Sequence, residues 1–261
     1  MKKDFSEKNP GLLVPKRPVN VQDVLDDLPR LRSGLSREKK INNNFVKWAE
    51  TLYGIIDQEW FNKGKYKHHS DSIVKTLESI FKNELNQGSE FIPYWKTKKK
   101  KLKDYELTKW YLDERLKGVC NHSSRSHMVS DLYRYLYASS FAEENNRSPL
   151  LEEFPAELIP AHKNASSGHF NDRFRVQVAT KPSTTVTSHI SKDGHYFIHY
   201  DPEQCRSLTV REAARLQTFP DNYFFEGSRT QQYIQVGNAV PPLLARQIAE
   251  IVHELIQRTS N

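Results

Sequence analysis

Helix boundaries in the last fifth of this 261-residue chain are fixed by one capping pattern and by prolines. Thr209 and Glu212 have the spacing of a capping box, which predicts that a helix begins at Thr209. Pro220 restricts the residue before it, so this helix must end near Gln217. A final helix is expected from Pro241-Pro242, since proline is tolerated in a first helical turn. Its apolar stripe consists of Leu244, Ile248, Ile251 and Leu255.

The first forty residues indicate an extended lead-in, because prolines interrupt any long helix. These prolines are Pro10, Pro15, Pro18 and Pro29. One short helix is expected across Val21 to Leu28. Three longer helices are predicted from apolar residues at helical spacing, running from Ile41 to Ile56, from Ile73 to Leu85 and from Leu132 to Ser139. Ser70 or Asp71 is the expected cap of the second.

After residue 165 the pattern changes to short strands. Apolar and polar residues alternate from Phe174 to Val178, which is typical of a half-buried strand. Ser183 to Thr187 and Tyr196 to Ile198 are β-prone, and Lys192-Asp193-Gly194 between them is a turn signal. The chain therefore combines helices with short strands, which indicates the α/β class.

Lysine and arginine total 39 against 32 acidic residues, a formal charge of +7. Such a surplus favours nucleic acid or an anionic membrane surface, although many soluble proteins are mildly basic without such a partner. No stretch approaches the roughly 20 apolar residues that span a bilayer. The charged amino terminus is not followed by an apolar run, and the only two cysteines are Cys120 and Cys205. We therefore expect a cytoplasmic protein without a disulfide framework.

Two long motifs carry most of the information on function. The first is RSLTVREAARLQTFPD, from Arg206 to Asp221, and the second is QVGNAVPP, from Gln235 to Pro242. Together they resemble the ninth and tenth sequence motifs of the cytosine-5 DNA methyltransferase family. Asp193 to His199 resembles the family segment that leads into the ninth motif, and Val21 to Pro29 resembles the stretch behind the eighth. The resemblance covers both ends of the chain and is weakest between residues 40 and 120.

The amino-terminal half of this family supplies three elements that the sequence lacks. They are a Phe-x-Gly-x-Gly cofactor loop, a Pro-Cys nucleophile and a Glu-Asn-Val acid motif. Neither cysteine of this chain follows a proline, and Glu144-Asn145 continues into Asn146. The reaction class requires a thiolate that attacks C6 of cytosine and a carboxylate that assists at N3. We therefore expect no catalytic residue in this chain.

The resemblance implies that Asn238, Ala239 and Val240 line one edge of a pocket for S-adenosyl-L-methionine, which the missing catalytic half completes. From the residues alone, Gly237 permits a backbone conformation closed to other residues, and Asn238 offers both a donor and an acceptor. The alternative is a simple Gly-Asn turn before a proline-started helix.

Arginines recur in the ninth motif, and Arg211 and Arg215 lie four residues apart on one face of the expected helix. In the resemblance this motif organises the recognition domain, so Arg206, Arg211 and Glu212 are assigned structural bracing. Contact between these arginines and DNA phosphates is the alternative.

A lysine run lies between Tyr94-Trp95 and Tyr105 and includes Lys98, Lys99, Lys100 and Lys101. Lysines neutralise phosphates and aromatic rings can stack on exposed bases, so the run is a predicted DNA contact. The alternative is a solvated run that keeps a loop soluble. The ten histidines lack the accompanying ligand spacing of a zinc site, so no metal is expected.

The expected architecture is a partial methyltransferase of the α/β class. Residues 1–40 are the lead-in after the eighth motif, 41–180 a largely helical target-recognition domain, and 181–230 strands with the ninth-motif helix. Residues 231–261 hold the tenth motif and a docking helix, which would complete a doubly wound catalytic domain on a different chain.

The sequence therefore predicts the target-recognition part of an S-adenosyl-L-methionine-dependent DNA (cytosine-5-)-methyltransferase, belonging to a restriction-modification system. Its expected partners are double-stranded DNA and a chain that bears the first eight motifs, and no membrane. Two alternatives stay open. The chain is a stand-alone DNA-binding regulator, or it is a non-functional gene fragment.

Overall fold

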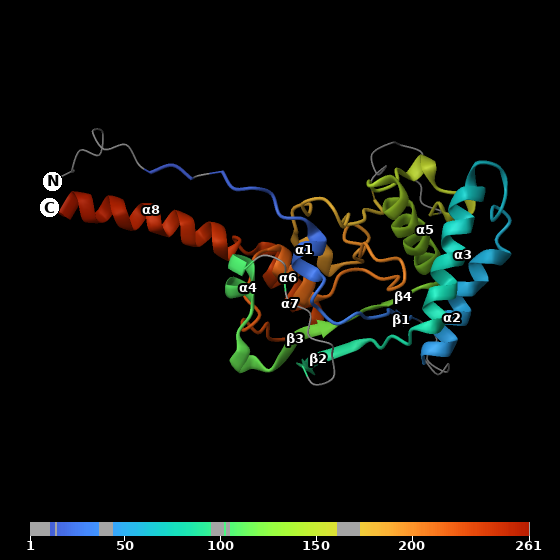
Figure 1. Ribbon diagram of the computed structural model, residues 1–261, viewed down its shortest axis with the longest axis horizontal. Helices are drawn as coiled ribbons and strands as arrows, with labels where there is room; N and C mark the ends of the chain where they lie inside the picture. The colour runs from blue at the N-terminus through green and yellow to red at the C-terminus, as the bar shows by residue number, and fades with distance from the viewer. Residues whose placement is uncertain are drawn as a thin grey trace.

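The structure is a computed structural model that describes residues 11–13, 15–36, 44–94, 102, 105–160 and 173–260. Its α-helices are α1 (Val21–Leu25), α2 (Phe45–Tyr53), α3 (Lys67–Lys82), α4 (Tyr105–Tyr111), α5 (Val129–Asn145), α6 (Val210–Leu216), α7 (Arg229–Asn238) and α8 (Pro242–Ser260). Short 3-10 helices are η1 (Gly54–Asp57), η2 (Gly64–Tyr66), η4 (Glu114–Leu116), η5 (Leu151–Glu153), η6 (Ala156–Leu158) and η7 (Ser188–Ser191). Figure 1 shows α2, α3 and α5 at one end of the body, and α6 and α7 at the other, from which α8 projects.

The strands of the described residues are short and lie between these two ends: β1 (Gly34–Leu35), β2 (Gly88–Pro93), β3 (Gly118–Ser123) and β4 (Ser126–His127). β2 and β3 are antiparallel over their whole length, and β1 pairs with β4 in parallel. Within the described ranges each sheet has two strands. The fold is thus a mixture of helices with short strands, as expected for the α/β class.

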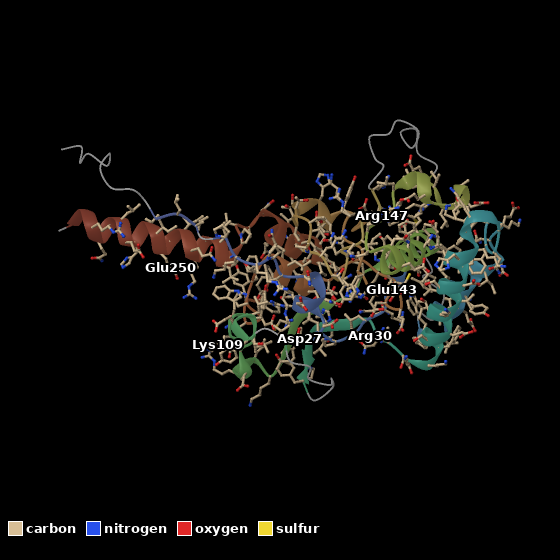
Figure 2. All side chains as sticks on the ribbon, turned by 45° about the horizontal axis from the view of Figure 1, so that its top comes forward. Asp27, Arg30, Lys109, Glu143, Arg147 and Glu250 are labelled. Atoms are coloured by element: carbon tan, nitrogen blue, oxygen red, sulfur yellow. The ribbon has the colours of Figure 1, made fainter. Side chains whose placement is uncertain are left out.

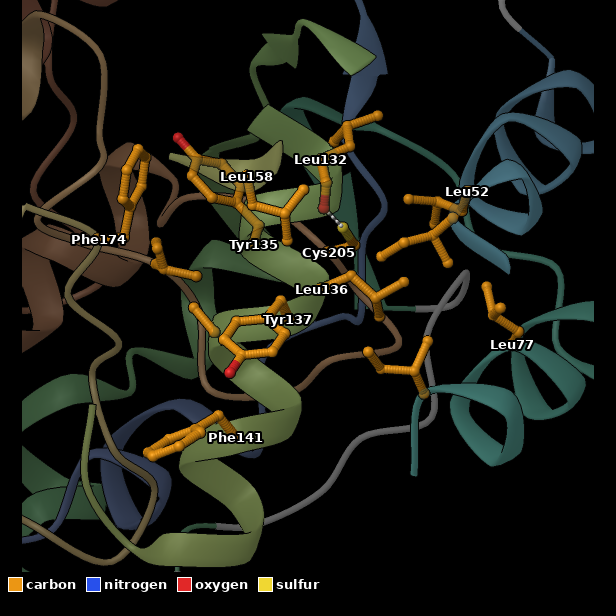
Figure 3. Close-up of a cluster of buried hydrophobic side chains, with 14 of the residues drawn as sticks. Leu52, Leu77, Leu132, Tyr135, Leu136, Tyr137, Phe141, Leu158, Phe174 and Cys205 are labelled. Carbon is orange, nitrogen blue, oxygen red and sulfur yellow. Dashed lines mark hydrogen bonds between the residues drawn. The ribbon is translucent and has the colours of Figure 1, made fainter. Parts of the chain in front are cut away.

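The described residues form two apolar clusters. The first, the helical core, contains buried residues of α2, α3 and α5 together with Phe174 and Cys205 (Figure 3). Trp48 and Leu52 of α2 are four residues apart, so both point to the same side and both are fully buried. Burial of each leucine or isoleucine here stabilises the fold by roughly 1.5–3 kcal/mol. The Cys205 thiol donates to the carbonyl oxygen of Leu132 at 3.2 Å, so it belongs to this packing.

The carboxyl-terminal core is the second cluster, and it joins residues from both ends of the chain. Val21, Val24 and Leu25 of α1 pack there with Ala213 and Ala214 of α6 and with residues of η7 and α7. The small side chains of α6 allow α1 to approach closely. This core positions the ninth and tenth motifs.

Several predicted helix boundaries are confirmed. Thr209 is the N-cap of α6 within a capping box, Gln217 is its C-cap, and α8 begins at Pro242. The predicted cap of α3 is wrong, because the helix already begins at Lys67. Ser70 lies inside it, where its hydroxyl donates to the Tyr66 carbonyl. Ile41, the predicted start of periodicity, lies outside the described residues, and α2 begins at Phe45.

The strands predicted after residue 165 are reduced to isolated bridges. Val176 pairs with Ile198, and Ile198 pairs with Ser207. Ser183 to Thr187 forms no strand, because the Gln177 side chain accepts from the backbone N–H of Thr184 at 3.0 Å in place of a strand partner.

Candidate functional site

The ninth-motif helix, α6, is buried from Val210 to Arg215. Its capping box is complete. The Thr209 hydroxyl accepts from the Glu212 backbone N–H at 3.2 Å, and the Glu212 carboxylate accepts from the Thr209 N–H at 2.7 Å. A helix with charged side chains that is buried on all sides needs internal partners for those charges.

Arg206 and Glu212 form such a pair. Two guanidinium nitrogens of Arg206 donate to the two carboxylate oxygens of Glu212, each at 2.6 Å, and both residues are at most 1% exposed. Burial by itself raises the pKa of Glu212, but the Arg206 charge outweighs it, so the pKa lies well below its usual range. Arg206 also donates to the side chain of Gln204 and to the carbonyl of Leu31.

Two buried histidines border this pair. Nδ1 of His122 lies 2.9 Å from the Thr209 hydroxyl, and Nε2 lies 2.8 Å from the Pro29 carbonyl, which needs an N–H donor there. His199 Nε2 lies 3.5 Å from the Glu212 carboxylate. Burial lowers the pKa of His122 and of His199 to about 4, so both rings are neutral at pH 7.

Arg211 and Arg215 connect α6 to distant segments. Arg211 donates to the carbonyls of Cys120, Pro220 and Tyr223. Arg215 pairs with Asp221 at 2.6–2.9 Å and with Asp27, which follows α1. Both carboxylates raise the pKa of Arg215 against the opposing effect of burial.

These arginines are 0–1% exposed, so their guanidinium groups cannot reach a phosphate in this structure. Asp27 and Asp221 were not identified from the sequence. The spacing of Arg211 and Arg215 signalled a charged face, but no local pattern indicates which carboxylates meet it.

The predicted cofactor residues lie where α7 ends and α8 begins. Asn238 is the last residue of α7, Ala239 is partly buried, and Val240 is 61% exposed. The interpretation of Gly237 needs correction, since it lies within α7 and is not in the positive-φ region. A Cβ there would lie 2.3 Å from the Ser188 backbone nitrogen, so glycine is needed for close approach to η7. The helix α7 was not predicted, although Ser228 and Gln231 form its capping box.

α8 projects from the body, and residues of the lead-in run beside it (Figure 1). Figure 2 shows Glu250 of α8 well away from Arg147 at the helical end. One face of α8 is apolar and 38–56% exposed, formed by Leu244, Ile248, Val252 and Ile256. On the lead-in, Leu12 is 86% exposed. We call α8 together with the lead-in from Gly11 to Leu13 the arm. Its exposed apolar side chains on α8 are contiguous, unlike the single exposed apolar residues that are normal on a protein surface.

Lys98, Lys99, Lys100 and Lys101 lie outside the described residues. Tyr105 follows this run and is among the described residues. Its side chain is 67% exposed, and the Lys109 ammonium lies 4.3 Å from the centre of its ring. A cation over an exposed ring is a surface that suits stacking and phosphate contact together.

A pocket of about 250 Å³ lies between α5 and residues 178–180 and is lined by Glu143 and Asp201. Burial raises the pKa of Glu143, and neighbouring carboxylates raise it further. Because negative charge repels phosphate, we do not assign this pocket to the DNA backbone.

No three His, Cys, Asp or Glu side chains gather to hold a metal ion among the residues that the structure describes. No helix in the described part of the chain has the length and apolar character to cross a bilayer.

The buried ninth-motif helix and the exposed tenth-motif junction lie within a region that matches a known family. The chain belongs to the C-5 cytosine-specific DNA methylase family, which it matches over residues 32–254. It is 37% identical to the type II methyltransferase M.Bpa9945I of Bacillus paralicheniformis, over 96% of this chain and 59% of that protein. It is 45% identical to M.OihORF3336P of Oceanobacillus iheyensis, over 92% of this chain and 45% of that protein. A shorter match, 46% identical over 29% of this chain and 16% of the relative, is the DNA (cytosine-5-)-methyltransferase M.ApeKI of Aeropyrum pernix. The chain spans about half the length of the first two of these relatives.

Proposed function

We propose that this chain is the target-recognition part of a DNA (cytosine-5-)-methyltransferase of a restriction-modification system, and that a separate chain supplies the chemistry. The observation that carries the proposal is the position of the two cysteines. Cys205 is 1% exposed in the helical core and Cys120 is 7% exposed on β3, and burial raises the pKa of both thiols. A nucleophilic cysteine needs a lowered pKa and access to its substrate. Membership in the family supports methyl transfer, so we propose that the nucleophilic thiolate comes from residues outside this sequence.

Binding of double-stranded DNA is the role we propose for this chain in that assembly. Lys98 to Lys101 would contact phosphates, next to the exposed Tyr105 and Lys109. The target cytosine must leave the stack before chemistry, so the recognition part has to hold a distorted duplex. We expect this work to take place in the cytoplasm.

Structural bracing is the role we propose for Arg206, Arg211 and Glu212. The burial of all three residues and the hydrogen bonds from the two arginines to backbone carbonyls support it, because each arginine joins α6 to a different segment. These hydrogen bonds would keep the recognition surfaces in a fixed position relative to the junction of α7 and α8.

For the cofactor we propose that Asn238, Ala239 and Val240 form one edge of the S-adenosyl-L-methionine site. The family uses this cofactor, which supplies the methyl group. The residues fit an edge, because the amide of Asn238 and the apolar side chain of Val240 are both exposed at a helix end. Because Asn238 and Val240 are both exposed, we propose that the remaining wall of the site belongs to the companion chain.

The domain organisation follows from the same proposal. Residues 1–40 form the lead-in, and residues 41–180 form the target-recognition domain. Residues 181–230 contain the bracing ninth-motif helix, and residues 231–261 contain the helix that docks on the catalytic chain. The exposed face of α8 supports docking against the catalytic chain, since Leu244, Ile248, Val252 and Ile256 would be covered there.

The test is reconstitution. The chain, a companion bearing the first eight family motifs, and both together are incubated with radiolabelled S-adenosyl-L-methionine and mixed-sequence DNA. We expect label in DNA only with both chains present. Transfer by this chain alone would contradict the division of roles. Specific duplex binding without any transfer by the pair would favour a stand-alone regulator, and neither binding nor transfer would favour a gene fragment.

A further inference from the structure

Gln217 and Thr218, the two residues that follow α6, form hydrogen bonds on either side of the segment Gly237 to Pro242. This segment contains the proposed cofactor edge. The side-chain amide of Gln217 donates to the carbonyl of Val236 at 3.3 Å, one residue before the segment. The hydroxyl of Thr218 accepts from the backbone N–H of Leu243 at 3.1 Å, one residue after it. Neighbouring side chains thus fix the segment from both sides.

Gln217 also sets the approach of α7 to η7. It is 7% exposed, and the same amide donates to the carbonyl of Val186 at 3.0 Å. Gly237 packs against Ser188 of η7, so Gln217 and Gly237 act at the same contact. The carbonyl of Val236 belongs to the last turn of α7, where it also accepts from the backbone N–H of the C-cap residue Ala239 at 3.4 Å.

Thr218 has an unusual backbone conformation. Its φ is +63°, a region that β-branched residues avoid because of steric crowding. Such strain persists only where the surrounding structure holds it, and it marks positions with a specific task. In this conformation the Thr218 carbonyl accepts from Trp110 Nε1 at 2.8 Å while its hydroxyl reaches α8. The Arg246 guanidinium of α8 lies 5.9 Å from the centre of the Trp110 ring.

We infer that Gln217 and Thr218 are positioning residues for the S-adenosyl-L-methionine edge formed by Asn238 to Val240. The inference rests on the proposed function. Neither residue touches the cofactor; they act by fixing where the Asn238 amide lies at the end of α7. Because α8 leaves the body immediately after this segment, the same pair also sets the direction in which α8 projects.

The first test compares variants in the reconstituted enzyme. Thr218→Val keeps the shape and removes the hydroxyl, whereas Thr218→Ser keeps the hydroxyl. Thr230→Val, the same change at an exposed position of α7, is the matched control. We expect Thr218→Val to raise the KM for S-adenosyl-L-methionine about two- to tenfold, the range that one ordinary hydrogen bond supports. The KM for DNA should stay unchanged, the thermal midpoint should fall by no more than a few degrees, and Thr218→Ser should restore the wild-type values.

The second test reads geometry in this chain alone. Cysteines introduced at Lys75 on α3 and Glu254 on α8 are exposed and accept nitroxide labels, whereas Cys120 and Cys205 are buried. Pulsed electron paramagnetic resonance spectroscopy then gives the distribution of distances between the two labels. We expect Thr218→Val to shift or broaden it, Thr218→Ser to restore it, and Thr230→Val to leave it unchanged.

The outcomes separate the inference from the proposed function. If the wild-type pair transfers methyl groups but Thr218→Val leaves the KM for S-adenosyl-L-methionine unchanged, the inference is overturned and the function stands. An unchanged distance distribution overturns it as well. If the wild-type pair transfers no methyl group, the proposed function fails, and the cofactor role of Gln217 and Thr218 fails with it.

Discussion

Replacing Glu212 by glutamine should destabilise this chain strongly while leaving the shape of α6 intact. Glutamine is accepted at the third position of a capping box, so the helix start is preserved. What disappears is the negative charge opposite Arg206, which is 0% exposed and donates twice to the carboxylate at 2.6 Å. Leaving one partner of a buried ion pair uncompensated costs about 3–5 kcal/mol. At about 2–4 °C per kcal/mol for a chain of this size, the thermal midpoint should fall by roughly 10 °C.

The measurement is urea unfolding followed by tryptophan fluorescence, together with thermal unfolding followed by circular dichroism. Glu226→Gln makes the same change at an exposed position and serves as the control. We expect the control to stay within about 0.5 kcal/mol of wild type. A loss below about 1 kcal/mol in Glu212→Gln would refute the reasoning, because the Arg206 charge would then have found solvent or another partner.

Three further outcomes are expected. The free energy of unfolding should decrease as the pH is lowered from 6.5 to 4. In this range the histidines of the unfolded chain take up protons, whereas His122 and His199, with pKa values of about 4, stay neutral in the folded chain. A urea midpoint that does not change with pH would contradict this. Replacing Lys98 to Lys101 by alanine should weaken binding to all DNA sequences alike and reduce the salt slope by up to about 0.9 per lost contact, and an unchanged slope in fluorescence anisotropy would assign the run to solubility. Ile248→Asp with Ile256→Asp should abolish co-purification with the catalytic chain at an unchanged thermal midpoint, whereas a lowered midpoint would place α8 in this chain's own core.

Local chemistry made part of this structure predictable. The start and end of α6 follow from Thr209, Glu212 and Pro220, whose effects extend over three or four residues. The start of α8 at Pro242 follows in the same way. These boundaries depend on neighbours in sequence, so the sequence is sufficient.

Long-range features were not predictable, because they depend on residues that are far apart in the sequence. β3 is buried from Gly118 to His122 and includes the polar residues Asn121 and His122, so it lacks the apolar–polar alternation that signals a strand. Its polar side chains are matched by distant partners, such as the Pro29 carbonyl for His122. The candidate site shows the same limit. Its motif residues could be named, but the pairing of Arg215 with Asp27, 188 residues apart, is decided by packing.

The joining of both chain ends in the carboxyl-terminal core has a consequence for biosynthesis. Val21, Val24 and Leu25 of α1 are synthesised long before Ala213 and Ala214 of α6, with which they pack. Contacts of such large sequence separation form slowly, because a long loop must close before they stabilise anything. The apolar side of α1 therefore stays uncovered until α6 has been synthesised. A nascent chain that stalls before α6 would expose this surface to chaperones or to other nascent chains, even with the helices of the helical core already made.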